Sequence, residues 1–223
     1  MRVLVACERS GVVRRAFEAL GHDAWSCDIE PADDGSNRHI RGDVRAHLDD
    51  GWDLLAVMHP PCTVLCNSGV KHLYIDGRKE NGRNPARWAA LEEAAEFYCS
   101  LRDAHQIPRR AVENPVMHRY AIEATRRGDV QFVQPWWFGD PYFKATGLEL
   151  IGLPKLVATN RLTPPKPGTD EHKAWSKVHR ESPGPARARR RSQTFPGLAA
   201  AMAMQWGGVA EESDQLEMFG AAA

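Results

Sequence analysis

The sequence predicts an α/β protein built on a doubly wound, mostly parallel sheet, and three observations carry this prediction. Short, continuously apolar segments alternate with segments whose apolar residues recur at helical spacing. The apolar segments lack polar alternation, which is typical of strands that are buried on both faces of a parallel sheet. Polar clusters containing Gly or Pro follow these segments, at the strand ends where such sheets bind ligands.

The first half of the chain predicts four strands and one helix. The first strand is RVLVA at 2–6, and the helix after it places Val12, Val13, Ala16, Phe17 and Leu20 at helical spacing and ends at Gly21. Three more strands are expected in HDAWSCD at 22–28, HIRGDV at 39–44 and DLLAVM at 53–58. The last of these is the most apolar and is therefore expected near the centre of the sheet.

The second half predicts two helices, a fifth strand and a hairpin. The clearest helix runs from about Pro85 to Ala104, a strand follows at 109–112, and MHRYAIEATRR at 117–127 is the next helix. QFVQPWWFG at 131–139 and ATGLELIGLP at 145–154 then predict two strands. Because no helix fits between them, they are expected to pair as a terminal antiparallel hairpin in a Rossmann-like sheet.

The chain divides into a core at 1–153, a basic Pro-rich segment at 154–193, a closing helix at 194–207 and an expected disordered tail at 208–223. The formal net charge is zero, but residues 155–193 carry ten Lys and Arg against three Asp and Glu, and residues 194–223 carry four acids and no Lys or Arg. A basic segment of this kind indicates either a phosphate-facing surface or a solvated loop. Both interpretations remain open from charge alone.

Several classes of protein are not indicated. No apolar run approaches the roughly 18 residues of a membrane span, and the N-terminal apolar run is too short for a signal peptide, so a cytoplasmic location is expected. The five cysteines include no CxxC pair and are expected to be free thiols. Cys62 and Cys66 have no second matching pair, so no metal site is predicted.

Five polar clusters follow expected strands: CERSG at 7–11, CDIEP at 27–31, GD at 42–43, HPPCT at 59–63 and ENP at 113–115. The first offers only Gly11 where a dinucleotide-binding loop would have three glycines. Asp28 can accept from both hydroxyls of a ribose, and Asp43 from an adenine amino group. Either acid alone also fits a cap or turn residue, but together they indicate an adenosine-bearing cofactor without phosphates.

These clusters resemble the motifs of the cytosine-5 DNA methyltransferases, in that family's order over roughly residues 1–152. Pro60-Pro61-Cys62 is similar to the nucleophile motif, and Glu113-Asn114-Pro115 is similar to the glutamate motif. FGDPYFKATGLELIG at 138–152 resembles a later conserved segment, with Lys144 and Thr146 at its two arginine positions. The sequence as a whole is most similar to short members of the family from phages and prophages.

The resemblance implies that residues 1–153 form an S-adenosylmethionine-dependent catalytic core that methylates carbon 5 of cytosine in DNA. Cys62 would add to carbon 6 of the base, and Glu113 would donate a proton at N3. The catalytic residues implied are Pro61, Cys62, Glu113, Asn114 and Lys144. The residues implied to bind S-adenosyl-L-methionine are Cys7, Glu8, Ser10, Gly11, Asp28, Ile29, Asp43 and Pro60.

Other interpretations stay open. Pro-Pro-Cys alone also fits a structural thiol at a turn, and the chain is alternatively a pyrimidine-modifying relative that acts on another base or a free nucleotide, or a catalytically silent DNA-binding homologue. His59 and His118 are interpreted as ordinary surface or capping residues. The basic segment is too short for the separate recognition domain of full-size members, so its expected role is phosphate contact, by Arg187, Arg189, Arg190 and Arg191.

A last motif lies in the acidic tail. QLEMF, Gln215 to Phe219, resembles the short peptide by which bacterial replication and repair proteins bind the sliding clamp. It predicts clamp binding, with a folded-back tail or coincidence as the alternatives.

Overall fold

The computed structural model describes residues 1–177 and 194–208. Its centre is one seven-stranded sheet in the order β3-β2-β1-β4-β5-β7-β6. The strands are β1 Arg2–Ala6, β2 Asp23–Asp28, β3 His39–Arg41, β4 Leu54–Val57, β5 Arg109–Asn114, β6 Val130–Val133 and β7 Thr146–Ile151. Only β7 runs antiparallel to its neighbours, β5 and β6, and every other pair is parallel. This confirms the predicted fold class.

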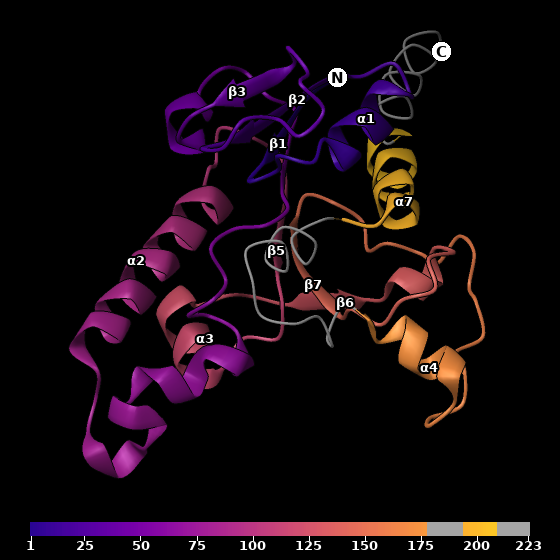
Figure 1. The fold of residues 1–223 in the computed structure, drawn as a ribbon. Coiled ribbons are helices and arrows are strands. Elements are labelled where there is room, and N and C mark those ends of the chain that lie inside the picture. The colour runs from indigo at the N-terminus through magenta and orange to yellow at the C-terminus, as the bar shows by residue number, and fades with distance from the viewer. Residues whose placement is uncertain (178–193, 209–223) are drawn as a thin grey trace, which may run out of the picture.

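Helices cover both faces of the sheet (Figure 1). The α-helices are α1 Val12–Glu18, α2 Pro85–Arg102, α3 Arg119–Thr125, α4 Asp170–Trp175 and α7 Pro196–Gly207, and the 3-10 helices are η1 Val44–His47, η2 Asn67–Leu73, η3 Ile75–Gly77, η4 Lys79–Asn81 and η5 Pro135–Trp137. α2 and α3 lie on one side of the sheet, and α1 and α7 lie against each other on the other side. No helix in the described ranges is long and apolar enough to cross a membrane.

The two faces of the sheet form two apolar cores. Val3 and Val5 of β1 point toward α1 and α7, where Trp206 is fully buried. Leu4 of the same strand points toward the face covered by α2, where Tyr98 is buried. Because successive strand residues point to opposite faces, a strand with both faces covered has to be apolar throughout, which explains the unbroken RVLVA segment.

The expected hairpin is present, but one of its strands is shorter than predicted. β6 ends at Val133, and η5 begins at Pro135, whose ring fixes φ and whose nitrogen has no hydrogen to donate to the sheet. The prediction of a strand over 131–139 is therefore wrong in its second half. The basic Pro-rich segment at 154–193 contains α4, whose first turn is capped by the Thr169 side chain.

Candidate active site

The Pro-Pro-Cys turn follows β4 directly and is held by backbone hydrogen bonds. Met58 N donates to Ala6 O of the neighbouring β1, at 2.9 Å, which keeps the chain in line with the sheet beyond Val57. Cys62 O accepts from the backbone N–H groups of Leu65 and Cys66, at 3.0 and 2.9 Å. Pro60 and Pro61 restrict φ on the way in. The half-buried Cys62 thiol therefore projects from a turn that is fixed on both sides.

Glu113 lies near the end of the neighbouring strand. β4 pairs with β5 up to Val57 and Val112, so Glu113 is the first residue of β5 beyond that pairing. Its side chain is buried, and burial raises the pKa of the carboxyl to about 7, against the opposing effect of Lys144. Burial also raises the pKa of the Cys62 thiol to about 11, and the charge of Glu113 adds to this effect. The negative charge of Glu113 therefore acts on the Cys62 thiol.

His59 is a member of this site that the sequence interpretation missed. The prediction of an ordinary surface or capping residue is wrong, because the side chain is only 14% exposed and its Nδ1 lies 4.0 Å from Glu113 Oε2. Its Nε2 lies 3.1 Å from Oγ1 of the buried Thr194, just before α7. Burial, with a smaller effect of Lys144, holds the pKa of His59 well below its usual value. The imidazole is therefore neutral at pH 7.

Asn114 is buried with an unsatisfied amide. Neither Nδ2 nor Oδ1 has a hydrogen-bond partner among the described residues. An unpaired buried polar group costs about 1–3 kcal/mol, so the pair of atoms indicates a place for a polar ligand. Gly147 of β7 lies opposite, and a Cβ there would lie 2.6 Å from Asn114 O. Glycine at this position lets β7 approach closely beside the end of β5.

Lys144 contributes positive charge from the segment between η5 and β7. Its ammonium favours the ionised forms of Glu113 and Cys62 and disfavours the protonated form of His59. The backbone N–H of Lys144 donates to Gln134 Oε1 at 3.1 Å. Thr146 occupies the second of the two positions where the motif of the cytosine-5 DNA methyltransferases has arginine. It is buried, and its Oγ1 donates to Lys144 O at 3.2 Å. It therefore holds the backbone that carries Lys144.

The turn after Cys62 is tied to the turn after Glu113. Cys66 forms an isolated antiparallel bridge with Met117, and Asn67 N donates to Val116 O at 2.9 Å. His118 Nδ1 accepts from Ala121 N at the start of α3, so its Nε2–H donates to Val64 O, at 2.7 Å. His118 is thus a buried capping residue that joins the two turns.

Gly69 lies where the chain packs closely beside the Cys62 turn. It is buried, and a Cβ added to it would lie 2.1 Å from Thr63 O, inside van der Waals contact. The residue is needed for close packing of η2 against the Cys62 turn.

The segment between β1 and α1 forms a shaped loop. Cys7 and Gly11 both have left-handed backbones, with φ of 56° and 66°, and such strain in a residue other than glycine is found mostly at functional sites. Glu8 turns inward and is fully buried, and its carboxylate accepts from Val13 N, Arg14 N and Ser10 Oγ. Glu8 therefore caps α1, whose N-cap residue is Gly11 and offers no side chain.

The strand-end acids lie around the end of β1. Burial raises the pKa of the Cys7 thiol, and the charges of Asp28, Asp43 and Glu113 raise it further, so the three acids lie within electrostatic range of one thiol. Asp28 Oδ1 accepts from Glu30 N at 2.9 Å. Ile29 beside it is 73% exposed, which is high for a large apolar side chain. The prediction that these clusters lie at one edge of the sheet agrees with this arrangement.

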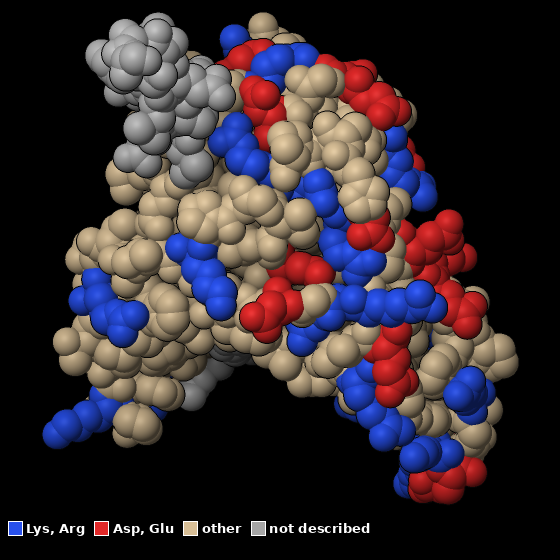
Figure 2. Space-filling model, turned by 180° about the vertical axis from the view of Figure 1, so that it is seen from behind, with Lys and Arg blue, Asp and Glu red and all other residues tan. Residues whose placement is uncertain are grey.

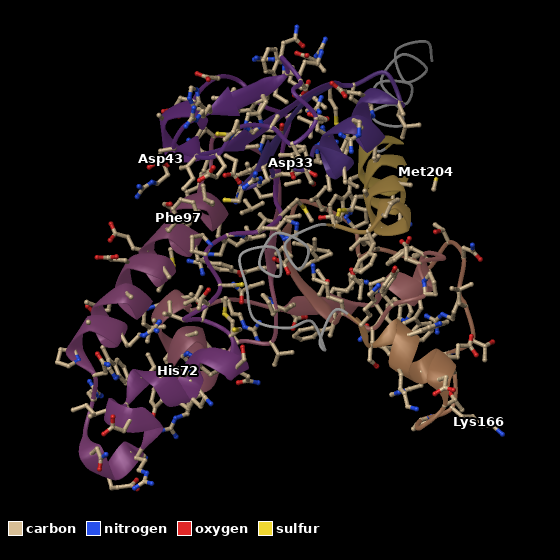
Figure 3. The ribbon with its side chains drawn as sticks, in the orientation of Figure 1. Asp33, Asp43, His72, Phe97, Lys166 and Met204 are labelled. Carbon is tan, nitrogen blue, oxygen red and sulfur yellow. The ribbon has the colours of Figure 1, made fainter. Side chains whose placement is uncertain are left out.

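Asp43 is already paired. It caps η1, and its two oxygens accept from Arg45 Nε and Nη2 in a forked ion pair, which holds the pKa of its carboxyl below the usual range. Figure 3 shows Asp43 and Asp33, which follow β3 and β2, in the same region of the molecule. Any ligand of Asp43 would share the carboxylate with Arg45.

The remaining predicted site residues have different positions. The residues that lie outside the described ranges are Arg187, Arg189, Arg190, Arg191 and the motif Gln215–Phe219.

A cavity of about 400 Å³ lies between η2, η3 and the start of α2, lined by Lys71, His72 and Arg87 among others. His72 is far from Asp43 in Figure 3, so this cavity is separate from the strand-end cluster. Within the described ranges, no group of three His, Cys, Asp or Glu side chains is placed to hold a metal ion.

Comparison with known proteins gives likenesses to solved structures alone. No protein-family model and no curated protein matches the chain. One structure, described as a DNA modification methyltransferase encoded within an E. coli prophage, is 14% identical to this chain, with a TM-score of 0.40. The alignment covers 67% of this chain and 46% of the prophage protein. A mutant of Spodoptera frugiperda DNMT2 is 12% identical to this chain, with a TM-score of 0.35. The alignment covers 76% of this chain and 53% of the DNMT2 chain. The chain thus aligns with about half the length of each. Because both TM-scores are below 0.5, the site is assigned from this chain's own residues.

Proposed function

We propose that this chain is an S-adenosylmethionine-dependent methyltransferase that acts on carbon 5 of cytosine in DNA. The observation that carries the proposal is the placement of Cys62 and a buried Glu113 at adjacent strand ends, where the charge of Glu113 acts on the Cys62 thiol. The sequence motifs around both residues support it independently. A nucleophile beside a group with a pKa near 7 is the arrangement expected of covalent catalysis with proton transfer.

The chemistry follows from the two residues. The Cys62 thiolate forms a bond to carbon 6 of cytosine, and Glu113 transfers its proton to N3, so the negative charge that develops on the ring is neutralised. Carbon 5 thereby becomes nucleophilic and would accept the methyl group that bound S-adenosyl-L-methionine supplies, as the methyl–sulfur bond breaks and the neutral thioether is released. A base then removes the proton from carbon 5, the sulfur–carbon bond breaks, and N3 returns its proton to Glu113. Asn114, whose amide has no partner among the described residues, supplies a donor and an acceptor beside this path.

The protonated form of Glu113 favours the ionised form of Cys62. With a pKa of about 11, roughly one Cys62 thiol in ten thousand is ionised at pH 7. Protonation of Glu113 removes a negative charge that disfavours the thiolate, and the Lys144 ammonium stabilises it. The form of Glu113 that donates to N3 is therefore also the form that makes Cys62 more acidic.

The strand-end residues fit S-adenosyl-L-methionine, which supplies the methyl group when bound. Asp28 offers a carboxylate for the ribose, and the exposed Ile29 offers an apolar surface for adenine. Cys7, Ser10 and Gly11 belong to the strained loop after β1, and the buried Pro60 follows β4, the strand that pairs with β1. Glu8 acts indirectly in this proposal by capping α1, and Asp43 acts together with Arg45.

The proposed DNA contact relies on residues outside the described ranges. Figure 2 shows Lys and Arg interleaved with Asp and Glu on one half of the pictured face, while the other half is mostly uncharged with a few separate Lys and Arg side chains. An interleaved surface binds phosphates weakly, because each acid offsets a neighbouring base. Arg187, Arg189, Arg190 and Arg191 therefore remain the proposed phosphate contacts, and clamp binding through Gln215–Phe219 remains a prediction from sequence.

A mechanism-based trap tests the proposed function. With S-adenosylmethionine present, the protein is expected to form a stable covalent complex with DNA containing 5-fluorocytosine, because fluorine at carbon 5 cannot leave as the proton does. A complex that resists denaturation on a gel is the expected result, and the Cys62→Ala variant is its control. Trapping of a fluorinated free nucleotide instead would favour the pyrimidine-modifying alternative. DNA binding with no covalent product would favour the silent homologue.

The cofactor site predicts a loss of affinity for Ile29→Ser. Removal of an apolar surface against adenine is expected to weaken S-adenosylmethionine binding by about tenfold, as measured by calorimetry. Val157→Ser is a matched control, since Val157 is similarly exposed at 70% but lies beyond β7, where Val157 N and O bond the Gln205 side chain. Equal affinities of the two variants would remove Ile29 from the cofactor site.

A further inference from the structure

Three side chains from distant parts of the chain form a polar line beside the proposed reaction centre. Thr194 precedes α7, His59 follows β4, and Glu113 lies near the end of β5. His59 lies between the other two, with Nε2 3.1 Å from Thr194 Oγ1 and Nδ1 4.0 Å from Glu113 Oε2. All three are largely buried, so water offers them little alternative hydrogen bonding.

The neutral imidazole limits how this line can be protonated. It carries one N–H donor and one nitrogen acceptor, so one end donates and the other accepts. If Nδ1 accepts, it stabilises Glu113 with its proton; if Nδ1–H donates, it stabilises the carboxylate. The 4.0 Å separation is about 1 Å beyond hydrogen-bond length, so a small side-chain movement forms either contact.

We propose that His59 is a positioning residue that holds Glu113 in its proton-donating form, with Nδ1 accepting the carboxyl proton and Nε2–H donating to Thr194 Oγ1. This inference rests on the proposed function for its catalytic meaning. The carboxyl that must reach N3 of the base is then oriented by the imidazole, and the imidazole is oriented by a hydroxyl from the far end of the chain. Thr194 thereby connects the closing helix to the reaction centre.

The surroundings are consistent with this direction of the hydrogen bonds. Burial of Glu113 favours its protonated form, and a buried carboxyl proton needs an acceptor. The charged group that acts on both members of the pair is Lys144 before β7, and Cys66 and Lys144 act on the adjoining nucleophile Cys62. Glu113 itself acts on Cys62 after β4 and on Cys7 after β1. Lys144 favours ionised Glu113, so loss of the acceptor on His59 would leave burial alone to oppose that effect.

The direct test measures the titration of Glu113 in the full chain. Glutamate labelled with ¹³C at the carboxyl carbon is followed by NMR against pH, and Glu113→Gln assigns the signal. In His59→Leu, which removes both nitrogens, the pKa of Glu113 is expected to fall by about one unit. In His59→Asn, which can place an amide oxygen near the Nδ1 position, most of that shift is expected to be recovered. Thr194→Val and Thr194→Ser form a second pair, with a smaller shift in the first and recovery in the second.

Turnover provides the second readout. The pH at which the kcat profile stops rising is set by loss of the Glu113 proton while the Cys62 thiolate still increases. This pH is expected to move lower in His59→Leu by the same amount, with S-adenosylmethionine affinity unchanged. An unshifted Glu113 signal, or a shift to higher pH, overturns the inference, since the latter would mean that Nδ1–H donates. Failure of the proposed function is seen separately, as a wild-type protein that forms no covalent complex with 5-fluorocytosine DNA while the NMR shift persists.

Discussion

Replacement of Cys62 by alanine is expected to abolish methyl transfer while S-adenosylmethionine binding survives. The thiol forms the bond to the base in the proposed reaction and has no part in holding the cofactor. The turn is held through the Cys62 carbonyl, which accepts from Leu65 N and Cys66 N, so the substitution leaves these bonds in place. Transfer of labelled methyl groups to DNA and calorimetry of the cofactor are the two measurements.

Cys66→Ala is the matched control for this experiment. Cys66 lies on the same turn, and its sulfur contacts Ser68 Oγ at 3.0 Å, while its backbone N–H makes the structural bond. This variant is expected to keep activity within a few-fold of wild type. Measurable turnover in Cys62→Ala, or its loss in Cys66→Ala alone, would reassign the nucleophile.

Replacement of Glu113 by glutamine is expected to have two effects of opposite direction. Methyl transfer should slow by about a hundredfold or more, since an amide has no carboxyl proton to give to N3. The Cys62 thiol should at the same time become more reactive, because the charge that raises its pKa is gone. Alkylation of Cys62 by iodoacetamide, followed at that residue by mass spectrometry at pH 8, measures the second effect.

Glu123→Gln is the control here, since it makes the same change to an exposed carboxylate on α3. It is expected to alter neither rate. The wild-type profile adds a check on the sign: the fraction of protonated Glu113 falls as pH rises through its pKa of about 7, while the fraction of Cys62 thiolate keeps rising toward its pKa of about 11. The rate of methyl transfer is therefore expected to rise with pH up to about 7 and to level off above it. A Glu113→Gln variant that transfers methyl groups at the wild-type rate would contradict the assignment of the acid.

The sequence predicts the parts of this fold that depend on local pattern. Unbroken apolar strands, the Pro85 helix start and the polar clusters after strands are read from neighbouring residues, and they locate Cys62 and Glu113 at one edge of the sheet. Which strand of the hairpin pairs with β5 is a long-range choice, and β7 takes that place although it comes last in the chain. Likewise, Pro135 ends β6 at a point where aromatic residues still predict a strand.

Other features depended on contacts that no local pattern reveals. His59 has its partners at Glu113 and Thr194, and only the folded chain brings these residues together. Glu8 is predicted from its motif position as a cofactor contact, but Gly11 leaves α1 without a side-chain cap, and Glu8 supplies it. A carboxylate shortly before a glycine at a helix start was the signal available for that role.

The tie between the Cys62 turn and the segment after Glu113 has a consequence for redesign by segment exchange. The Cys66–Met117 bridge and the His118 contacts to Val64 and Leu65 join residues 62–69 to residues 115–121. The two segments should therefore be exchanged together. A chimera that takes only one of these segments from another protein would separate residues that contact each other. Gly69 packs too closely against Thr63 O for the chain to shift there. Recombination libraries should therefore place their crossovers outside both segments and move them as a pair.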